Sequence, residues 1–362
     1  MLFNQIIFFI YTGYVILIMN YLFLVPLTLF SKNNYSLIKE CKTMHASLLV
    51  NNFFYIMKMN MYLSIQDKID VTNTDKIDII MCNHISIFDY LILIILLKEL
   101  GIDYYNFTFK KGLNKGLGLY MIHCDTDILV NRDWSSDKDN IDKQLDKIKP
   151  LNKKQVIIIY PEGNRINYER LLTSQKYSQD NDLPIYNNLL TPKVKGIWYM
   201  INKLKSENKL GSVWDISLIR PNYITNPPNK KLLNNTQNWL DLVYKKFDDY
   251  YVIINKVKYP EYYKDYDKFK SWFYSYWDYK DIQMTNYKKY DYYKINDDNK
   301  YSIKNIKTDY IIIIILLFVS IYLLSHKEGR KIFLFLFILS YILIYTRPKI
   351  YTQPKIMKNI EK

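Results

Sequence analysis

The chain has 362 residues, 49% of them hydrophobic, and carries 50 Lys and Arg against 35 Asp and Glu, a formal net charge of +15. This length supports one large core and argues against three domains. A basic chain suits nucleic acid, an anionic membrane surface or phosphorylated substrates, and apolar stretches at both ends favour the membrane, although many of the lysines could simply form a solvated surface. Three scattered cysteines without metal-binding spacing indicate reduced thiols in a cytosol-facing domain.

Residues 1–31 are predicted to form a membrane anchor. No charged side chain precedes Lys32, and residues 6–30 are almost entirely apolar. As a helix this run would extend about 37 Å, enough to cross a hydrocarbon core of about 30 Å. It lacks the basic start of a cleavable signal peptide, so the anchor is expected to be retained. Lys32, Lys39 and Lys42 then predict a cytosolic location for the rest of the chain by the positive-inside rule.

Residues 32–74 are predicted to be an amphipathic, membrane-proximal segment, with a helix over 45–64 that lies on the membrane or against the core. From 75 to 279 the pattern changes to that of an α/β domain. Short apolar runs predict strands at 78–81, 156–160, 212–219 and 251–257, with an apolar helix over 87–100. Strands separated by helical stretches favour a mixed sheet covered by helices.

The C-terminal part begins with residues 280–309, whose Tyr, Lys, Asn and Asp content predicts a polar linker. Two apolar runs, 310–324 and 332–345, follow. Each is short for a full membrane crossing, so 310–346 is predicted to be an apolar hairpin whose topology stays open. A basic tail, 347–362, ends the chain.

The first group of residues suited to chemistry runs from Asn83 through His84 to Asp89, directly after a predicted strand. A His can take the proton from an attacking alcohol, and a carboxylate can fix its tautomer. Five residues on a regular helix turn through about 500°, so His84 is expected in the turn before a helix and Asp89 in its first turn. The alternative is structural: Ser86 and Asp89 could form a capping box, with His84 an ordinary loop residue.

The second group is Pro161-Glu162-Gly163-Asn164-Arg165, directly after an apolar strand. Pro ends the strand, Gly permits an unusual turn, and an Arg can grip a phosphate through its planar fork. Charged side chains are thereby presented at a strand's carboxyl end, where open α/β sheets bind ligands. The alternative is an ordinary turn with solvated charges.

The order and separation of the two groups resemble the glycerophospholipid acyltransferase family, which has an N-H-x-x-x-x-D motif followed by P-E-G-T-R. Further stretches resemble that family, and the later ones resemble its lysophosphatidate and lysocardiolipin branch. These stretches, within a resemblance over about 75–260, are 109–118, 128–134, 137–145, 190–196 and 213–218. Two positions depart from the pattern: Asn164 stands where Thr is usual and Lys193 where Arg is common, which affects headgroup recognition more than the proposed base.

The resemblance implies that acyl-CoA and a lysophospholipid, lysophosphatidate first, are the substrates, with no cofactor and no metal. His84 would be the general base and Asp89 would orient it, while Ser86 lacks a separate base and no acyl-enzyme is required. The residues implied for binding the phosphate, glycerol or CoA portions are Lys110, Arg132, Glu162, Gly163, Arg165 and Lys193.

Several alternatives remain from the sequence. The acceptor could be another lysophospholipid, such as lysocardiolipin or lysophosphatidylinositol, or the chain could be an inactive membrane scaffold that binds lipid. A nucleic-acid-binding protein is suggested by charge alone and is opposed by the apolar ends. The expected location is an intracellular membrane such as the endoplasmic reticulum, with the catalytic domain in the cytosol.

Overall fold

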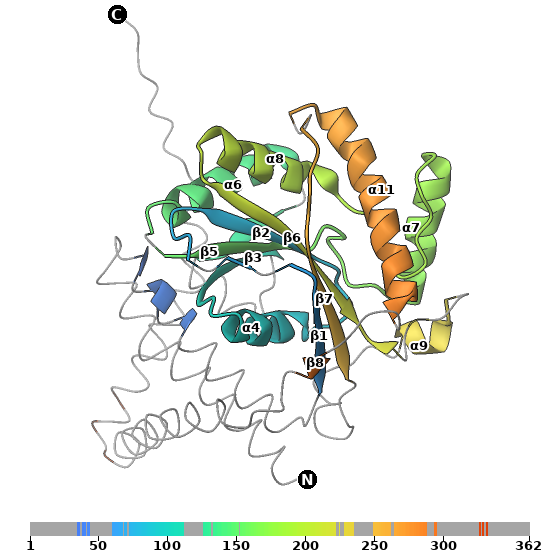
Figure 1. Ribbon diagram of the computed structural model, residues 1–362, viewed down its shortest axis with the longest axis horizontal. Coiled ribbons are helices and arrows are strands. Elements are labelled where there is room, and N and C mark those ends of the chain that lie inside the picture. Colours follow the sequence, from blue (N-terminus) through green and yellow to red (C-terminus); the bar gives the residue numbers. More distant parts are fainter. Residues whose placement is uncertain are drawn as a thin grey trace, which may run out of the picture.

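The computed structural model shows, in its described part, a mixed sheet with helices on both faces (Figure 1). The described residues are 35–36, 38–40, 42–43, 60–111 except 68 and 71, 126–221 except 132 and 152, 224, 228–234, 249–287 except 262 and 263, 293–294, 326, 328 and 331.

The sheet combines parallel and antiparallel pairs. In order across it lie β4 (Ile128–Val130), β3 (Tyr104–Lys110), β5 (Gln155–Ile159), β2 (Ile77–Cys82), β6 (Leu210–Ile219), β7 (Tyr250–Lys256), β1 (Met61–Ile65) and β8 (Tyr293–Lys294). From β4 to β6 all neighbours are parallel. β7 is antiparallel to β6, β1 is parallel to β7, and β8 is antiparallel to β1. The predicted mixed sheet is thus confirmed, and β2, β5, β6 and β7 match the four predicted strands within two residues at each end.

The central strands are buried along their whole length. Every residue of β2 and of β5 is buried, as their continuous apolar sequences predict for strands covered on both faces. The polar exceptions are Gln155 in β5 and Asp78 in β2. The Asp78 carboxylate accepts from Trp214 Nε1 at 2.9 Å and lies 2.8 Å from Lys154 Nζ. A charge in the middle of the sheet is therefore compensated, as burial requires.

Helices cover the two faces unequally (Figure 1). On one face α4 (Asp89–Glu99) packs its buried Leu and Ile side chains against the strands. On the other face lie α6 (Trp134–Ile148), α8 (Val194–Ser206) and α11 (Tyr266–Thr285), with α7 (Tyr168–Asp180) and α9 (Lys230–Asn234) beside α11. The helix predicted over 87–100 corresponds to α4, and its lack of a polar stripe reflects burial almost all round.

Two predicted boundaries are wrong. The helix expected over 45–64 does not include its last residues, because Met61–Ile65 form β1, which pairs in parallel with β7. The polar linker was expected to begin at residue 280, but residues 280–285 are the last residues of α11, which continues to Thr285. Lys280 is completely buried there and bonds Asp215 Oδ1 at 2.5 Å, so a residue that reads as polar linker is part of the core.

Lys39 and Lys42, two of the three lysines expected to mark the cytosolic side of an anchor, have partners within the domain. Lys39 Nζ donates to Asn106 Oδ1 at 2.6 Å, and Lys42 Nζ forms a buried ion pair with Asp127 at 2.6 Å. The predicted anchor at 1–31, most of the hairpin at 310–346 and the basic tail at 347–362 lie outside the described residues. No helix within the described part of the chain is both long enough and apolar enough to cross a membrane.

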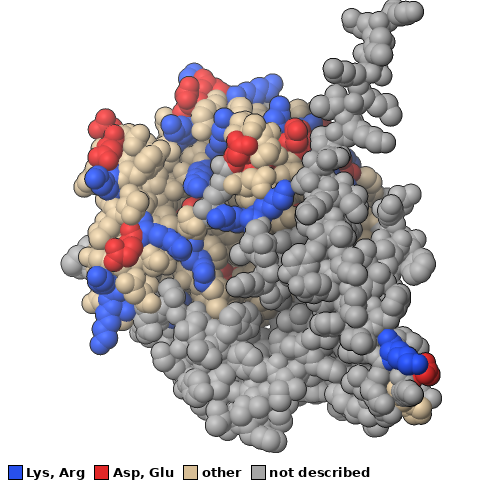
Figure 2. All heavy atoms as spheres, turned by 180° about the vertical axis from the view of Figure 1, so that it is seen from behind, with Lys and Arg blue, Asp and Glu red and all other residues tan. Residues whose placement is uncertain are grey.

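Charge is mixed on the face opposite to that of Figure 1. Lys and Arg side chains are spread over the described part of this face, with Asp and Glu side chains among them (Figure 2).

Candidate active site

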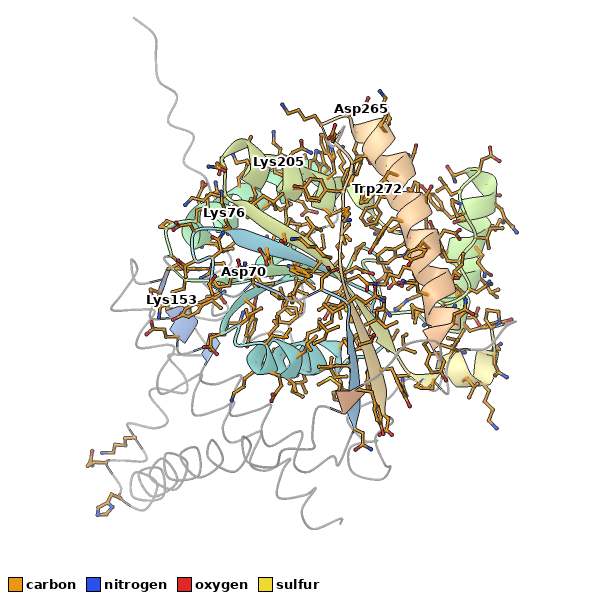
Figure 3. All side chains as sticks on the ribbon, viewed as in Figure 1. Asp70, Lys76, Lys153, Lys205, Asp265 and Trp272 are labelled. Carbon is orange, nitrogen blue, oxygen red and sulfur yellow. The ribbon has the colours of Figure 1, made fainter. Side chains whose placement is uncertain are left out.

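The two predicted groups of residues meet at one edge of the sheet because they follow neighbouring parallel strands. β2 pairs with β5 up to Met81 opposite Ile159, so the chain leaves both strands at the same level. Lys76 directly precedes β2 and Lys153 lies two residues before β5, so these two residues, labelled in Figure 3, mark the opposite, amino edge of the sheet. The loops are also joined directly, since the Ile166 amide donates to the His84 carbonyl at 2.8 Å.

His84 and Asp89 form a hydrogen-bonded pair. His84 Nδ1 lies 2.7 Å from Asp89 Oδ2, the imidazole is 24% exposed and the carboxylate is fully buried. With Nδ1–H donating to the carboxylate, Nε2 is left on the opposite side of the ring as an acceptor. As predicted, His84 stands in the turn before a helix and Asp89 begins that helix, which is what brings two residues five apart into contact.

Asp89 also caps the chain, which confirms part of the capping-box alternative, while the catalytic role of the pair remains a prediction. Its Oδ2 accepts from the Ile85 amide at 2.7 Å and from the Ser86 amide at 2.9 Å. The Ser86 hydroxyl accepts from the Phe88 amide at 3.2 Å, and Ser86 is completely buried. The capping contacts hold the carboxylate in place, and its third partner is the imidazole. Burial also makes Ser86 unsuitable as an accessible nucleophile.

Asn83 fixes the strand end from which His84 projects. Its side chain donates to the Leu218 carbonyl at 2.9 Å and accepts from the Leu218 amide at 2.8 Å. Both backbone groups belong to β6, the neighbour of β2 on the other side from β5. No role was predicted for Asn83, although its place directly before His84 was an available signal.

Glu162 supports the backbone of both loops. Its Oε1 accepts from the His84 amide at 2.7 Å, its Oε2 accepts from the Leu190 amide at 2.8 Å, and the residue is 3% exposed. Burial raises the pKa of this carboxyl group to about 8, while the two amides and Lys280 oppose that shift. These contacts make Glu162 a positioning residue, and its predicted contact with substrate remains a prediction.

The turn after Pro161 uses a left-handed glycine. Gly163 has a φ of +67°, and a Cβ added there would stand 3.4 Å from Lys193 Cδ. The Lys193 amide donates to the Pro161 carbonyl at 2.7 Å, so Lys193 lies against the turn through both backbone and side chain. Gly163 and Lys193, each predicted separately to bind substrate, thus lie in contact, and their binding roles remain predictions.

Arg165 is half-buried in the same turn. Burial, followed by repulsion from Arg170, lowers the pKa of its guanidinium, and attraction by the Asp89 carboxylate opposes this. The guanidinium therefore lies within the electrostatic field of the His84–Asp89 pair. A cleft beside the two loops is lined by Ile85, Ile166, Asn188, Leu218, Arg220, Ile224, Leu233 and Met284, and its Arg220 was not predicted.

Of the two remaining predicted binding residues, Lys110 and Arg132, the structure places Lys110 away from the His84–Asp89 pair. Lys110 is exposed at the carboxyl end of β3, two strands away from β2, which corresponds to about 10 Å across the sheet. Arg132 lies outside the described residues. Tyr160, which was not predicted, stacks its ring on that of His84 at a centroid distance of 4.4 Å.

Fold and site together define an α/β domain with a His–carboxylate pair and a nearby guanidinium at the carboxyl edge of its sheet. Residues 68–188 match the family model described as Acyltransferase. The matched range contains both groups of motif residues and the strands β2 and β5 that bring them together.

Named relatives share limited identity with the chain. It is 24% identical to 1-acyl-sn-glycerol-3-phosphate acyltransferase 2 of Arabidopsis thaliana over 152 residues, 41% of this chain and 38% of the relative. It is 24% identical to lysocardiolipin acyltransferase 1 of Mus musculus over 94 residues, 26% of this chain and 25% of the relative. For lysophosphatidylinositol acyltransferase 10 of Caenorhabditis elegans the identity is 25% over 118 residues, 33% of this chain and 27% of the relative. The chain thus spans less than two fifths of the length of these relatives.

Among solved structures, the 1-acyl-sn-glycerophosphate acyltransferase PlsC of Thermotoga maritima aligns with a TM-score of 0.36 and 13% identity, over 77% of this chain and 98% of that one.

Proposed function

We propose that this protein transfers an acyl group from acyl-CoA to the free hydroxyl of a lysophospholipid, with lysophosphatidate as the first candidate. The observation that carries the proposal is the His84–Asp89 contact of 2.7 Å at an accessible sheet edge, inside the segment that matches the acyltransferase family. Three relatives are named for acylation of lysophosphatidate, lysocardiolipin or lysophosphatidylinositol, which supports a lysophospholipid acceptor.

In the proposed reaction, His84 Nε2 takes the proton of the acceptor hydroxyl while that oxygen bonds to the thioester carbonyl carbon. Asp89 holds Nδ1–H and compensates the positive charge of the resulting imidazolium. The tetrahedral intermediate then expels the CoA sulfur by breaking its C–S bond. The leaving thiolate receives the proton from Nε2, which yields the ester and free CoA and restores the neutral imidazole.

The proposed headgroup site contains Arg165 and receives support from Lys193. A guanidinium offers two parallel N–H donors that match a phosphate, whereas an ammonium acts as a point charge. Both side chains lie beside the turn at Gly163, within reach of the loop that carries His84. An anionic acceptor would therefore place its phosphate near Arg165 and its free hydroxyl near Nε2.

We further propose that the protein works at an intracellular membrane, because the acceptor and product are lipids. The apolar residues 6–30 and the two apolar runs between 310 and 345 are the proposed anchoring segments. Removing 1–31 should weaken retention in membranes, and removing both regions should release most of the protein. Retention of the doubly truncated chain after carbonate extraction would contradict this assignment.

An acyl-transfer assay on membranes containing the full-length chain tests the function. Labelled acyl-CoA is offered with lysophosphatidate, lysocardiolipin, lysophosphatidylinositol and a lysophospholipid mixture, for wild type and His84→Ala. We expect a labelled diacyl product from wild type and none from His84→Ala at equal abundance. No transfer to any acceptor by wild type would favour the inactive lipid-binding scaffold. Transfer by His84→Ala close to wild type would instead refute the general-base role.

A further inference from the structure

The aromatic ring of Tyr160 covers one face of the His84 imidazole. The two ring centroids are 4.4 Å apart and the planes are inclined by 25°, which is a stacked arrangement. The contact follows from the sheet, because Tyr160 directly succeeds β5 and His84 is the second residue after the neighbouring β2. Neighbouring strands lie about 4.8 Å apart, which is close to the ring separation observed.

This stack restrains a motion that Asp89 leaves free. The hydrogen bond from Nδ1 to Asp89 Oδ2 acts in the plane of the imidazole and holds one edge of it. The ring can still tilt about the line joining these two atoms, which would move Nε2 out of position. A flat surface against one face opposes that tilt, so the hydrogen bond and the stack together fix the direction of Nε2.

Tyr160 is itself held firmly. The residue is 9% exposed and belongs to the core cluster between α4 and the sheet. Its ring stacks in turn near Phe107 of β3, at 6.4 Å with planes inclined by 15°. Phe107 is only a distant neighbour, so the wider core packing around Tyr160 is what fixes the ring beside the imidazole.

The ring, rather than the hydroxyl, provides the contact. The hydroxyl oxygen of Tyr160 is buried and has no hydrogen-bond partner among the described residues. An aromatic face also carries negative electrostatic potential and attracts a cation placed over it. The ring therefore favours the positively charged imidazolium that forms during proton transfer, and a phenylalanine ring would do so equally.

We propose that Tyr160 is a positioning residue for the reaction: it holds His84 Nε2 toward the acceptor hydroxyl and stabilises the imidazolium through its ring face. The inference rests on the proposed function, since it requires that His84 be the base.

The test compares kcat and KM for the lysophospholipid at saturating acyl-CoA, for full-length variants in membranes. Tyr160→Phe keeps the ring and should keep kcat close to wild type. Tyr160→Leu removes the aromatic face and should lower kcat by about tenfold or more at unchanged KM, because misplacing a catalytic group by about 1 Å can reduce the rate about 10²-fold. If Tyr160→Leu fails to accumulate, Tyr160→Met is measured with the same expectation.

Phe107→Leu is the matched control, because it removes another ring from the same stack without touching His84. It should reduce abundance or thermal stability at least as much as Tyr160→Leu, while kcat per folded molecule stays near wild type. An unchanged kcat in Tyr160→Leu, or equal kcat losses in both Leu variants, overturns the positioning role.

The His84→Ala variant distinguishes a wrong role for Tyr160 from a wrong proposed function. If His84→Ala is inactive and Tyr160→Leu is fully active, only the role of Tyr160 is wrong. If His84→Ala is active, or if wild type transfers no acyl group, the proposed function fails and the role of Tyr160 fails with it.

Discussion

Replacing Glu162 by Gln should separate the positioning of the loops from substrate binding. In wild type each carboxylate oxygen accepts one backbone amide, from His84 at 2.7 Å and from Leu190 at 2.8 Å. Either protonation state of the Glu offers an oxygen lone pair to both amides. A Gln side chain offers one oxygen and one NH2 group, and the NH2 group would face an amide donor. One of the two buried amides must therefore lose its partner.

The magnitude follows from that lost contact. Leaving a buried donor unsatisfied costs about 1–3 kcal/mol, and hydrogen bonds to charged groups lie at the upper end of the usual range. Displacement of the His84 backbone should also misplace Nε2, so we expect kcat to fall about tenfold to 10²-fold. If the role of Glu162 is purely positional, KM for the lysophospholipid should change little.

The assay combines urea unfolding, followed by fluorescence of the buried Trp214 and Trp277, with acyl-transfer kinetics. Glu169→Gln is the control, since Glu169 lies in the same segment, is 67% exposed and pairs with Lys230 at 3.7 Å on the surface. Such surface pairs contribute about 0–1 kcal/mol, so this variant should resemble wild type. A Glu162→Gln protein with normal stability and kcat but a raised KM would refute the positional role. It would instead support direct contact between Glu162 and the substrate.

Three further predictions follow from neighbouring contacts. The carboxyl group of Glu162 has a pKa of about 8 when folded against its usual 4.5, so the folded state binds more protons between these values. The free energy of unfolding should therefore fall as pH rises through that window, and equal pH slopes in wild type and Glu162→Gln would contradict this. Gly163→Ala should cost about 1–2 kcal/mol in urea unfolding, because φ is +67° there, and a neutral effect would argue against this backbone conformation. Lys280→Met should lower the free energy of unfolding by about 3–5 kcal/mol, because it leaves the buried Asp215 carboxylate uncompensated. Adding Asp215→Asn should restore part of this stability. Additive losses in the double variant would contradict an interaction between Lys280 and Asp215.

Within the chain, local patterns predicted the elements that depend on local chemistry. Largely apolar runs identified β2 and β5, because strands buried on both faces need mainly apolar side chains. The five-residue spacing of His84 and Asp89 required a turn followed by a helix, and the structure has that arrangement. Where a strand has no such pattern, as in β1, the backbone partner on β7 determines its conformation.

Sequence patterns alone predicted the mixed α/β class, the two motifs and the pairing of His84 with Asp89. Tertiary structure decided which groups those motifs contact. Glu162 reaches the His84 amide, Tyr160 reaches the imidazole and Lys280 reaches Asp215 across 78, 76 and 65 positions of the chain. Local composition does not encode such partners. The order of strands brings distant segments to one edge, and burial then requires each polar group to find an acceptor or donor there.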